Sequence, residues 1–324
     1  MSKVKCLLCP RECELKEGQR GDCRARMNIG GKLQTLVYGK PCSVHVDPIE
    51  KKPLFHYLPG TGSFSIATAG CNLHCMYCQN WEISQREPEN TRNMDLSPED
   101  VIKEALAAKC RTIACTYSDP VIFFEYAADT GRLAHKNGLL NIWVTAGYIN
   151  PEPLKEAVTF IDAANIDLKG ITEDFYKTMS KAKLQPVQDC IKTMKDAGVW
   201  VEITNLVVPT YNDTTEDFSK LSEWIVDNVG VEVPLHFSKF WPMYQLKNLP
   251  PTPEEVLTRA REIAMSKGIH YVYVGNIPGH DGNNTYCPAC KNIAIARRGY
   301  MILEYNIVKG KCGFCNHVIP GKWE

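Results

Sequence analysis

The sequence lacks any long apolar run. No apolar stretch in its 324 residues reaches the roughly 18 residues that a membrane-spanning helix requires. The first eight residues, Met1 to Leu8, also lack the apolar segment of a secretory signal peptide. We therefore expect a cytoplasmic protein with no membrane partner, in which disulfide bonds are uncommon.

The sequence also has no excess charge of either sign. Its 37 Lys and Arg residues balance its 37 Asp and Glu residues. Such a chain has no global field that would attract nucleic acid or an anionic membrane surface, so we expect no nucleic-acid partner. The two short basic pairs, Lys51-Lys52 and Arg297-Arg298, are expected to be solvated surface residues.

Cysteine, by contrast, is abundant, with fifteen residues. In a cytoplasmic protein these are more often metal ligands than disulfide partners. Eleven of the cysteines fall into three groups, at the N-terminus, in the centre and at the C-terminus. The remaining four are expected to be buried apolar residues, an expectation that suits Cys42, which follows a proline, least well. These four are Cys42, Cys110, Cys115 and Cys190.

The central group has the spacing C-x3-C-x2-C and consists of Cys71, Cys75 and Cys78, directly after an apolar run that ends at Ala69. A [4Fe–4S] cluster normally takes four thiolates. Three ligands in one loop would leave one iron free to bind a reacting molecule, as an open position does on a catalytic zinc. A structural zinc is a poor alternative because no fourth ligand lies nearby in the sequence.

The N-terminal group has the spacing C-x2-C-x3-C-x9-C and consists of Cys6, Cys9, Cys13 and Cys23. Four soft ligands in so short a segment suit either tetrahedral zinc or a second iron–sulfur cluster. Free thiols in a loop are the alternative. The segment has too few apolar residues to fold without a metal, so we favour a metal site of one of these two kinds.

The C-terminal group consists of two C-x2-C pairs that 21 residues separate: Cys287 with Cys290, and Cys312 with Cys315. This is the pattern of a zinc ribbon, and a rubredoxin-like iron could use the same ligands. The residues between the pairs alternate between apolar and polar side chains as in a ribbon strand. We expect a four-cysteine metal site with a structural role.

Between these flanking groups, strand-like and helix-like segments alternate. Helix start signals occur at Ser97-Pro98 and Thr252-Pro253, and helix stop signals at Gly138, Gly198 and Gly268. Six or seven βα units favour a parallel barrel or partial barrel, with a flat doubly wound sheet as the alternative. The expected strands are 63–69, 112–117, 141–145, 163–168, 200–208, 234–240 and 270–274. The expected domains are an N-terminal metal-binding segment and linker over 1–60, a barrel over 61–280, and a four-cysteine ribbon over 281–324.

Polar residues gather where the expected strands end. In a parallel barrel the chemistry takes place at the carboxyl ends of the strands. We therefore expect these side chains to surround the loop from Cys71 to Cys78. They are Ser118, Asp119, Thr145, Asp167, Lys169, Glu202, Thr204, Asn205, His236, Lys239 and Asn276.

An aromatic residue, Tyr77, precedes the last cysteine of the central motif, and the resulting C-x3-C-x-Φ-C pattern resembles the radical S-adenosylmethionine (SAM) superfamily. Residues 47–54, residues 70–80 and both flanking cysteine groups resemble the AmmeMemoRadiSam group of that superfamily. Residues 60–275 are similar to pyruvate formate-lyase activating enzymes. The resemblance implies an α/β fold: a radical SAM partial (β/α)6 TIM-like barrel with an N-terminal Cys-rich metal knot and a C-terminal zinc-ribbon or rubredoxin-like module.

The resemblance also implies a cofactor site. Cys71, Cys75 and Cys78 would bind three irons of a [4Fe–4S] cluster, and the amino and carboxylate groups of SAM would bind the fourth. Tyr77 would lie near the adenine. Further contacts with SAM follow from segments that match family motifs. The Gly-Gly-Glu-Pro segment of the family corresponds to Tyr117-Ser118-Asp119-Pro120. The Thr-Asn-Gly turn of the family corresponds to Thr145-Ala146-Gly147, and its Asp-x-Lys element corresponds to Asp167-Leu168-Lys169. Glu202 and His236 are placed like later SAM contacts of the family.

The implied activity is reductive cleavage of SAM to a 5′-deoxyadenosyl radical, which takes hydrogen from a small-molecule or peptide substrate. One alternative is an activating enzyme that installs a glycyl radical on a partner protein. A non-catalytic metal scaffold is a third hypothesis, and the intact motif counts against it. A barrel mouth covered by the flanking modules would favour a small substrate, and an open mouth a protein partner. A flavodoxin or ferredoxin would supply the electrons.

Overall fold

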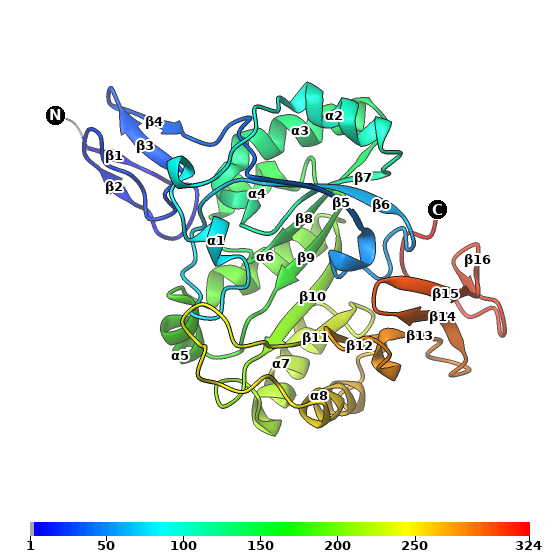
Figure 1. Cartoon of the computed structure of the whole chain (residues 1–324). Coiled ribbons are helices and arrows are strands. Elements are labelled where there is room, and N and C mark those ends of the chain that lie inside the picture. Colours follow the sequence, from blue (N-terminus) through cyan, green and yellow to red (C-terminus); the bar gives the residue numbers. More distant parts are fainter. Residues whose placement is uncertain (1–2) are drawn as a thin grey trace.

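In a computed structural model, which describes residues 3–324, the centre of the chain is one eight-stranded sheet (Figure 1). Seven of its strands are parallel: β6 (Gly62–Ala67), β7 (Thr112–Cys115), β8 (Leu140–Thr145), β9 (Ala163–Asp167), β10 (Trp200–Val207), β11 (Leu235–Lys239) and β12 (Val272–Gly275). Their order in the sheet follows the chain, without the reversal that defines a doubly wound sheet. The predicted α/β partial barrel is confirmed, and all seven expected strands are present.

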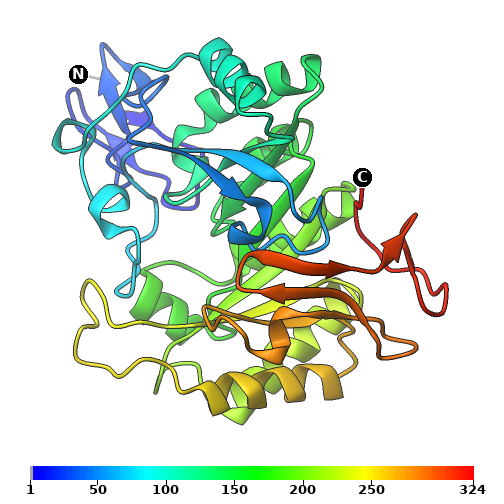
Figure 2. The same ribbon diagram turned by 45° about the vertical axis from the view of Figure 1, so that its right-hand side comes forward.

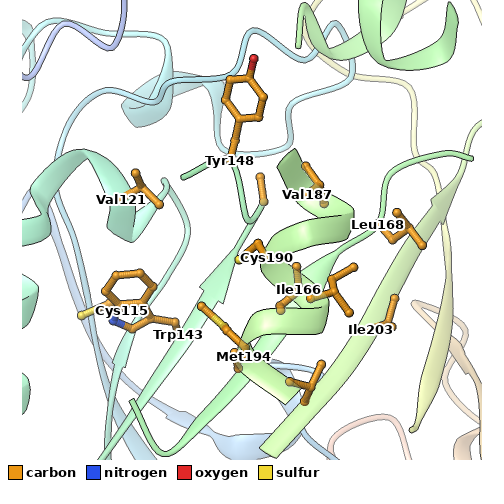
Figure 3. Packing of buried hydrophobic residues seen from close by; sticks show 14 of the residues in the cluster. Cys115, Val121, Trp143, Tyr148, Ile166, Leu168, Val187, Cys190, Met194 and Ile203 are labelled. Atoms are coloured by element: carbon orange, nitrogen blue, oxygen red, sulfur yellow. The ribbon is translucent and has the colours of Figure 1, made fainter. Parts of the chain in front are cut away.

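Helices cover the outer side of the curved sheet. They are α2 (Pro98–Ala107), α3 (Phe124–Lys136), α4 (Pro151–Ala157), α6 (Gln185–Asp196), α7 (Thr215–Asn228) and α8 (Glu254–Ser266), while the short α1 (Trp81–Ser84) and α5 (Glu173–Phe175) lie in the loops after β6 and β9. Figure 3 shows Cys190 and Met194 of α6 beside Ile166 of β9 in the buried layer between helix and strand. Among the cysteines outside the three groups, Cys110, Cys115 and Cys190 are buried as expected, and Cys42 is half-buried.

One expected helix start is confirmed and the other is displaced. Ser97 caps α2, accepting a hydrogen bond from the Asp100 N–H while the Asp100 carboxylate receives the Ser97 N–H. At α8 the cap is Pro253, one residue later than expected. The Thr252 hydroxyl is instead used inside the barrel, where it donates to the Val207 carbonyl at 2.6 Å. The three expected glycine stops follow their helices with positive φ angles.

The eighth strand of the sheet, β5 (Ser43–Pro48), was not expected from the sequence. It pairs antiparallel with β6 at the edge of the sheet. Its solvent-facing Val46 and terminal Pro48 give it the composition of a loop, and such residues are tolerated at an edge because one side of the backbone needs no partner. A short strand, β4 (Lys32–Thr35), precedes β5 along the chain and lies outside this sheet.

The N-terminal cysteines lie in two small hairpins beside the first barrel strands (Figures 1 and 2). The hairpins pair β1 (Val4–Lys5) with β2 (Glu14–Leu15) and β3 (Arg26–Ile29) with β4. Arg26 fixes this part to α3 by donating to Glu125 at 2.8 Å, and Arg11 Nε donates to the Asn72 carbonyl at 2.9 Å. The knot therefore packs directly against the loop that carries the central cysteines.

The C-terminal cysteines lie in a ribbon on the other side of the barrel (Figure 1). It consists of a three-stranded sheet and a short hairpin. The strands are β13 (Thr285–Tyr286), β14 (Ile293–Arg298) and β15 (Met301–Tyr305), with β16 (Ile307–Val308) and β17 (Lys311–Cys312). Within residues 3–324, no helix is long and apolar enough to cross a membrane.

The expectation that both basic pairs are solvated is wrong for one residue of each. The Lys52 side chain is fully buried and its Nζ lies 2.6 Å from Asp47 Oδ2. Arg297 is buried as well, and its Nη2 donates to the Phe55 carbonyl at 2.9 Å. Burial of each charge is compensated by a polar partner, Asp47 for Lys52 and, 242 residues away, the Phe55 carbonyl for Arg297.

Candidate active site

A cavity of about 340 Å³ opens at the carboxyl ends of the parallel strands. Its volume lies within the range of small-molecule sites. Nine of the eleven predicted residues of the central motif and its SAM contacts line this one cavity. They are Cys71, Cys75, Tyr77, Cys78, Ser118, Asp119, Thr145, Asp167 and Lys169. The structure thus brings together residues that the sequence spreads over about a hundred positions.

The three central cysteines surround the cavity without converging on one point. Cys75 is buried, and Cys71 and Cys78 are half-buried. Their sulfurs do not form a set within 4.8 Å of one another, unlike the C-terminal cysteines of the described chain. In an iron–sulfur cluster each thiolate binds a different iron, which requires sulfurs that stand apart around a space. The three residues fit such a cluster better than they fit a single ion.

Asp119 is held by the turn that follows β8. Its Oδ1 accepts from the Thr145 hydroxyl at 3.0 Å, and its Oδ2 accepts from the Ala146 N–H at 2.8 Å. Burial raises the pKa of Asp119, and these donors act against that shift. Asp119 and Thr145, predicted separately from two family motifs, therefore form one buried unit on the cavity wall.

Asp167 and Lys169 form an ion pair at the end of β9, the strand next to β8, with Lys169 Nζ 2.8 Å from Asp167 Oδ2. Burial disfavours the charged form of Lys169, but the Asp167 carboxylate outweighs this effect and the pKa of the lysine is raised. The Lys169 N–H also donates to the Tyr176 hydroxyl at 3.1 Å, which fixes the backbone here. The pair presents both a carboxylate and an ammonium group to the cavity.

Two tyrosines shape the wall near the cysteines. The Tyr77 ring is buried, and its hydroxyl lies 3.1 Å from Ser180 Oγ. Tyr117 has a φ of 64°, the left-handed conformation that favours glycine. The sequence comparison with the family motif predicts its first glycine at this position, and the match stays a prediction. The Tyr117 ring lies over Lys52, whose Nζ is 4.4 Å from the ring centroid.

Glu202 and His236 do not line this cavity. His236 Nε2 lies 2.7 Å from Glu202 Oε2 in a fully buried pair. Glu202 also accepts from the backbone N–H groups of Phe55 and His56, at 3.0 and 2.8 Å. Burial acts to raise the pKa of Glu202, but the hydrogen bond and charge of His236, with smaller contributions from His56 and the Phe55 N–H, lower it. The pair fastens the segment before β6 inside the barrel, and its predicted contact with SAM stays a prediction.

Some cavity residues were missed by the sequence analysis. Gln79, Asn80 and Ser84 follow the cysteine motif, and Lys51 and Tyr300 come from the flanking modules. Ser84 Oγ lies 3.0 Å from Cys78 Sγ. The first three could have been found from their position next to the motif. No sequence signal points to Tyr300, because only the fold brings the β14–β15 turn to the barrel mouth.

The two flanking cysteine groups differ in geometry. In the ribbon, Cys287 Sγ lies 3.6 Å from Cys315 Sγ, and Cys290 Sγ lies 3.7 Å from Cys312 Sγ. All four ligand atoms lie within 4.8 Å of one another, as a single bound ion requires. The N-terminal cysteines instead line a separate small cavity together with Asn72.

Comparison with known proteins agrees with this geometry. A family model described as the radical SAM superfamily matches residues 65–225. An uncharacterized protein of Methanocaldococcus jannaschii is 46% identical over 320 residues, which cover 98% of this chain and 95% of that protein. The pyruvate formate-lyase-activating enzyme of Clostridium pasteurianum is 28% identical over 173 residues, which cover 50% of this chain and 69% of the enzyme.

Solved structures support the same fold. A radical SAM methyltransferase from Sphaerobacter thermophilus superposes with a TM-score of 0.54 at 14% identity, covering 67% of each chain. Streptococcus suis SuiB bound to S-adenosylmethionine superposes with a TM-score of 0.52 at 11% identity, covering 70% of this chain and 53% of SuiB. The chain belongs to the radical SAM superfamily and is an enzyme homologous to pyruvate formate-lyase activating enzymes.

Proposed function

We propose that the protein cleaves SAM reductively at the central cavity and abstracts hydrogen from a small-molecule or peptide substrate. One observation carries this proposal: three separated cysteines, the Asp119–Thr145 unit and the Asp167–Lys169 pair all line the same cavity. When bound, the cluster supplies one low-potential electron that cleaves SAM to methionine and a 5′-deoxyadenosyl radical.

The residues of the chain then bind and orient SAM. Cys71, Cys75 and Cys78 would hold the [4Fe–4S] cluster, and SAM would bind beside it in the same cavity. The Asp119 carboxylate faces the cavity from a buried position and suits a cationic amino group, while the Lys169 ammonium suits a carboxylate or a ribose hydroxyl. Tyr77 supplies an aromatic wall for the adenine.

The C-terminal ribbon supports a small substrate. Tyr300, in the turn between β14 and β15, lines the same cavity as Cys71 and Asp119, so the ribbon covers part of the barrel mouth. A covered mouth limits access by a folded protein and excludes water from the reacting centre. Lys51 adds a further side chain from the N-terminal segment on the rim.

A glycyl-radical activating enzyme is the second candidate function. Homology to the pyruvate formate-lyase-activating enzyme favours it. Under either function we expect a cytoplasmic protein reduced by a flavodoxin or ferredoxin. The ribbon cysteines bind one zinc or iron ion with a structural role, because their sulfurs have the spacing of a single tetrahedral site.

The test is anaerobic reconstitution with iron and sulfide, reduction with dithionite in the presence of SAM, and mass spectrometry for 5′-deoxyadenosine. The wild-type protein should form it, and Cys75→Ala should not. The matched control is Cys110→Ala, which removes a buried cysteine outside the three groups and should retain activity. Normal 5′-deoxyadenosine formation by Cys75→Ala, or none by the loaded wild-type protein, would overturn the proposal.

Candidate substrates then separate the two functions. Small molecules and peptides are added to the reduced enzyme with SAM, and a modified product is sought by mass spectrometry. The activating function requires instead a protein whose glycine radical appears in electron paramagnetic resonance. A glycyl-radical signal on a protein partner, with no small-molecule product, would replace the first function by the second.

A further inference from the structure

The N-terminal cysteines enclose a space of their own. Cys6, Cys9, Cys13 and Cys23 line a cavity of about 20 Å³. A single buried water needs roughly 10–15 Å³ by the same measure. The space beside the four cysteines therefore admits at least one water-sized atom, whereas four thiolates on a single ion close around it.

Sulfur spacing distinguishes two kinds of metal site within this chain. Four thiolates at about 2.3 Å from one tetrahedral ion stand roughly 3.8 Å apart, which the C-terminal pairs match at 3.6 and 3.7 Å. Among the residues the structure describes, the N-terminal cysteines supply no three sulfurs within 4.8 Å of one another. The central cysteines, in the motif of a cluster-binding family, share this wider spacing. The N-terminal group therefore resembles the central group and differs from the ribbon.

Polar groups around the N-terminal cavity are directed at the sulfurs. The Asp22 N–H donates to Cys13 Sγ at 3.4 Å, and the backbone N–H groups of Arg11 and Ala25 donate to Cys9 and Cys23. Arg26 is buried, lines the cavity, and its Nε has no hydrogen-bond partner within residues 3–324. A cluster with four thiolates carries negative charge and has sulfur acceptors that such donors stabilise.

From these observations we propose that Cys6, Cys9, Cys13 and Cys23 bind a second [4Fe–4S] cluster, separated from the central site by one loop of backbone. Asn72 lines the N-terminal cavity and Cys71 lines the central one, and consecutive Cα atoms are about 3.8 Å apart. At Gly70, with φ of 97°, a Cβ would lie 2.3 Å from the Cys23 carbonyl oxygen. Only glycine allows this close approach of the two segments.

The second cluster can be present whether or not the proposed function is right. Only the statement that it lies beside a central cluster rests on the proposed function. The deciding variant is C71A/C75A/C78A, reconstituted anaerobically as the full chain. It should keep about four acid-labile sulfides per chain, with about four irons besides any iron in the ribbon, and, once reduced, show the resonance of a [4Fe–4S] cluster that SAM leaves unchanged. A zinc ion or a rubredoxin-like iron brings no sulfide. Stoichiometric metal without sulfide in this variant would overturn the proposal.

The complementary variant is Cys9→Ala in the otherwise wild-type chain, with Cys110→Ala as the matched control. Cys9→Ala should lose about half of the acid-labile sulfide, and Cys110→Ala none. If Cys9→Ala does not fold, the triple variant decides alone. Full sulfide content in folded Cys9→Ala would contradict the assignment of this ligand.

The short distance between the two clusters can be tested by electron paramagnetic resonance. Two reduced clusters on either side of one loop should interact magnetically, so the wild-type resonance should be broader than that of C71A/C75A/C78A. A wild-type spectrum equal to the sum of two isolated clusters would contradict the adjacency. Sulfide retained in the triple variant, together with no SAM cleavage by the wild-type protein, would overturn the proposed function and leave the second cluster in place.

Discussion

The hydrogen bonds of Asp119 connect the loop after β7 with the end of β8 at the cavity. Replacing Asp119 with Asn puts an amide N–H₂ opposite either the Ala146 N–H or the Thr145 hydroxyl, both of which now donate to the carboxylate. The loss of one buried acceptor costs about 1–3 kcal/mol. We therefore expect Asp119→Asn to weaken SAM binding by roughly tenfold or more, measured by equilibrium dialysis of the reconstituted protein. Asp95→Asn, on the surface, is the control, and equal SAM affinity in both variants would contradict a role for Asp119.

His56 gives a pH dependence of stability. It is fully buried, its Nδ1 donates to the Pro320 carbonyl at 2.7 Å, and its Nε2 accepts from the Tyr273 hydroxyl at 2.6 Å. Burial lowers the pKa of His56 to about 4 from 6.5. Between these values the unfolded chain binds the extra proton, so the free energy of unfolding falls as the pH falls.

The expected loss of stability from His56 between pH 7 and pH 5 is about 2 kcal/mol. Denaturant unfolding at the two pH values measures it. In His56→Gln this part of the pH dependence should disappear, whereas His270→Gln, an exposed control, should retain it. Parallel pH profiles for wild type and His56→Gln would show that the histidine is not held neutral.

At the residue scale, the sequence predicted those cavity residues that lie in a local pattern. The cysteine motif, Asp119, Thr145 and Asp167 each stand at a strand end, and alternation along the strands locates those ends. The sequence did not predict that the Lys52–Asp47 ion pair is buried, nor that Glu202 accepts from the Phe55 N–H 147 residues away, because only the fold creates these surroundings. A charged residue in isolation predicts a surface position.

Among the elements, the turn between β14 and β15 is the part of the ribbon that reaches the active site. Its Tyr300 lines the central cavity although it belongs to the C-terminal module. Replacing Tyr300 with Ala should widen the mouth and admit water and dioxygen. We expect several-fold faster bleaching of the iron–sulfur absorbance when the reconstituted protein is exposed to air.

Tyr305→Ala is the matched control for this change. Tyr305 lies on the same ribbon and is similarly exposed, at 41% against 46% for Tyr300. It does not line the central cavity. Equal bleaching rates in Tyr300→Ala and the wild-type protein would show that the turn does not protect the site.

The element boundaries were predictable where one residue type dictates the backbone. Gly138, Gly198 and Gly268 end their helices as expected, with φ angles of 74°, 84° and 100°. The edge strand β5 was not predictable because its pairing with β6 is non-local and its side chains are partly solvent-facing. Thr252 failed as a helix cap because its hydroxyl oxygen accepts from the buried Phe240 N–H at 2.9 Å and its O–H donates to the Val207 carbonyl.

For the whole molecule, the four ribbon cysteines and the barrel mouth are connected through one module. The buried Arg297 of β14 donates to the Phe55 carbonyl and to Thr285 Oγ1, at 2.9 and 2.7 Å, and so docks the ribbon on the barrel. The Cys290–Cys312 and Cys287–Cys315 pairs lie at the other end of the same module. An ion at these four cysteines fixes the ribbon strands and, through them, the turn that covers the cavity.

Replacing Cys312 with Ser should therefore affect both the metal content of the ribbon and the cover of the active site. We expect the loss of one bound zinc or iron ion per chain, with acid-labile sulfide unchanged, and a loss of at least about 2 kcal/mol, or about 5 °C in thermal midpoint for a chain of this size. Metal analysis and calorimetry measure these effects, and air bleaching should become faster, as in Tyr300→Ala. Cys42→Ser, which removes a half-buried cysteine outside the three groups, should change none of these quantities. A Cys312→Ser protein that loses its ion but bleaches at the wild-type rate would show that the ion holds the ribbon together without contributing to the cover of the active site.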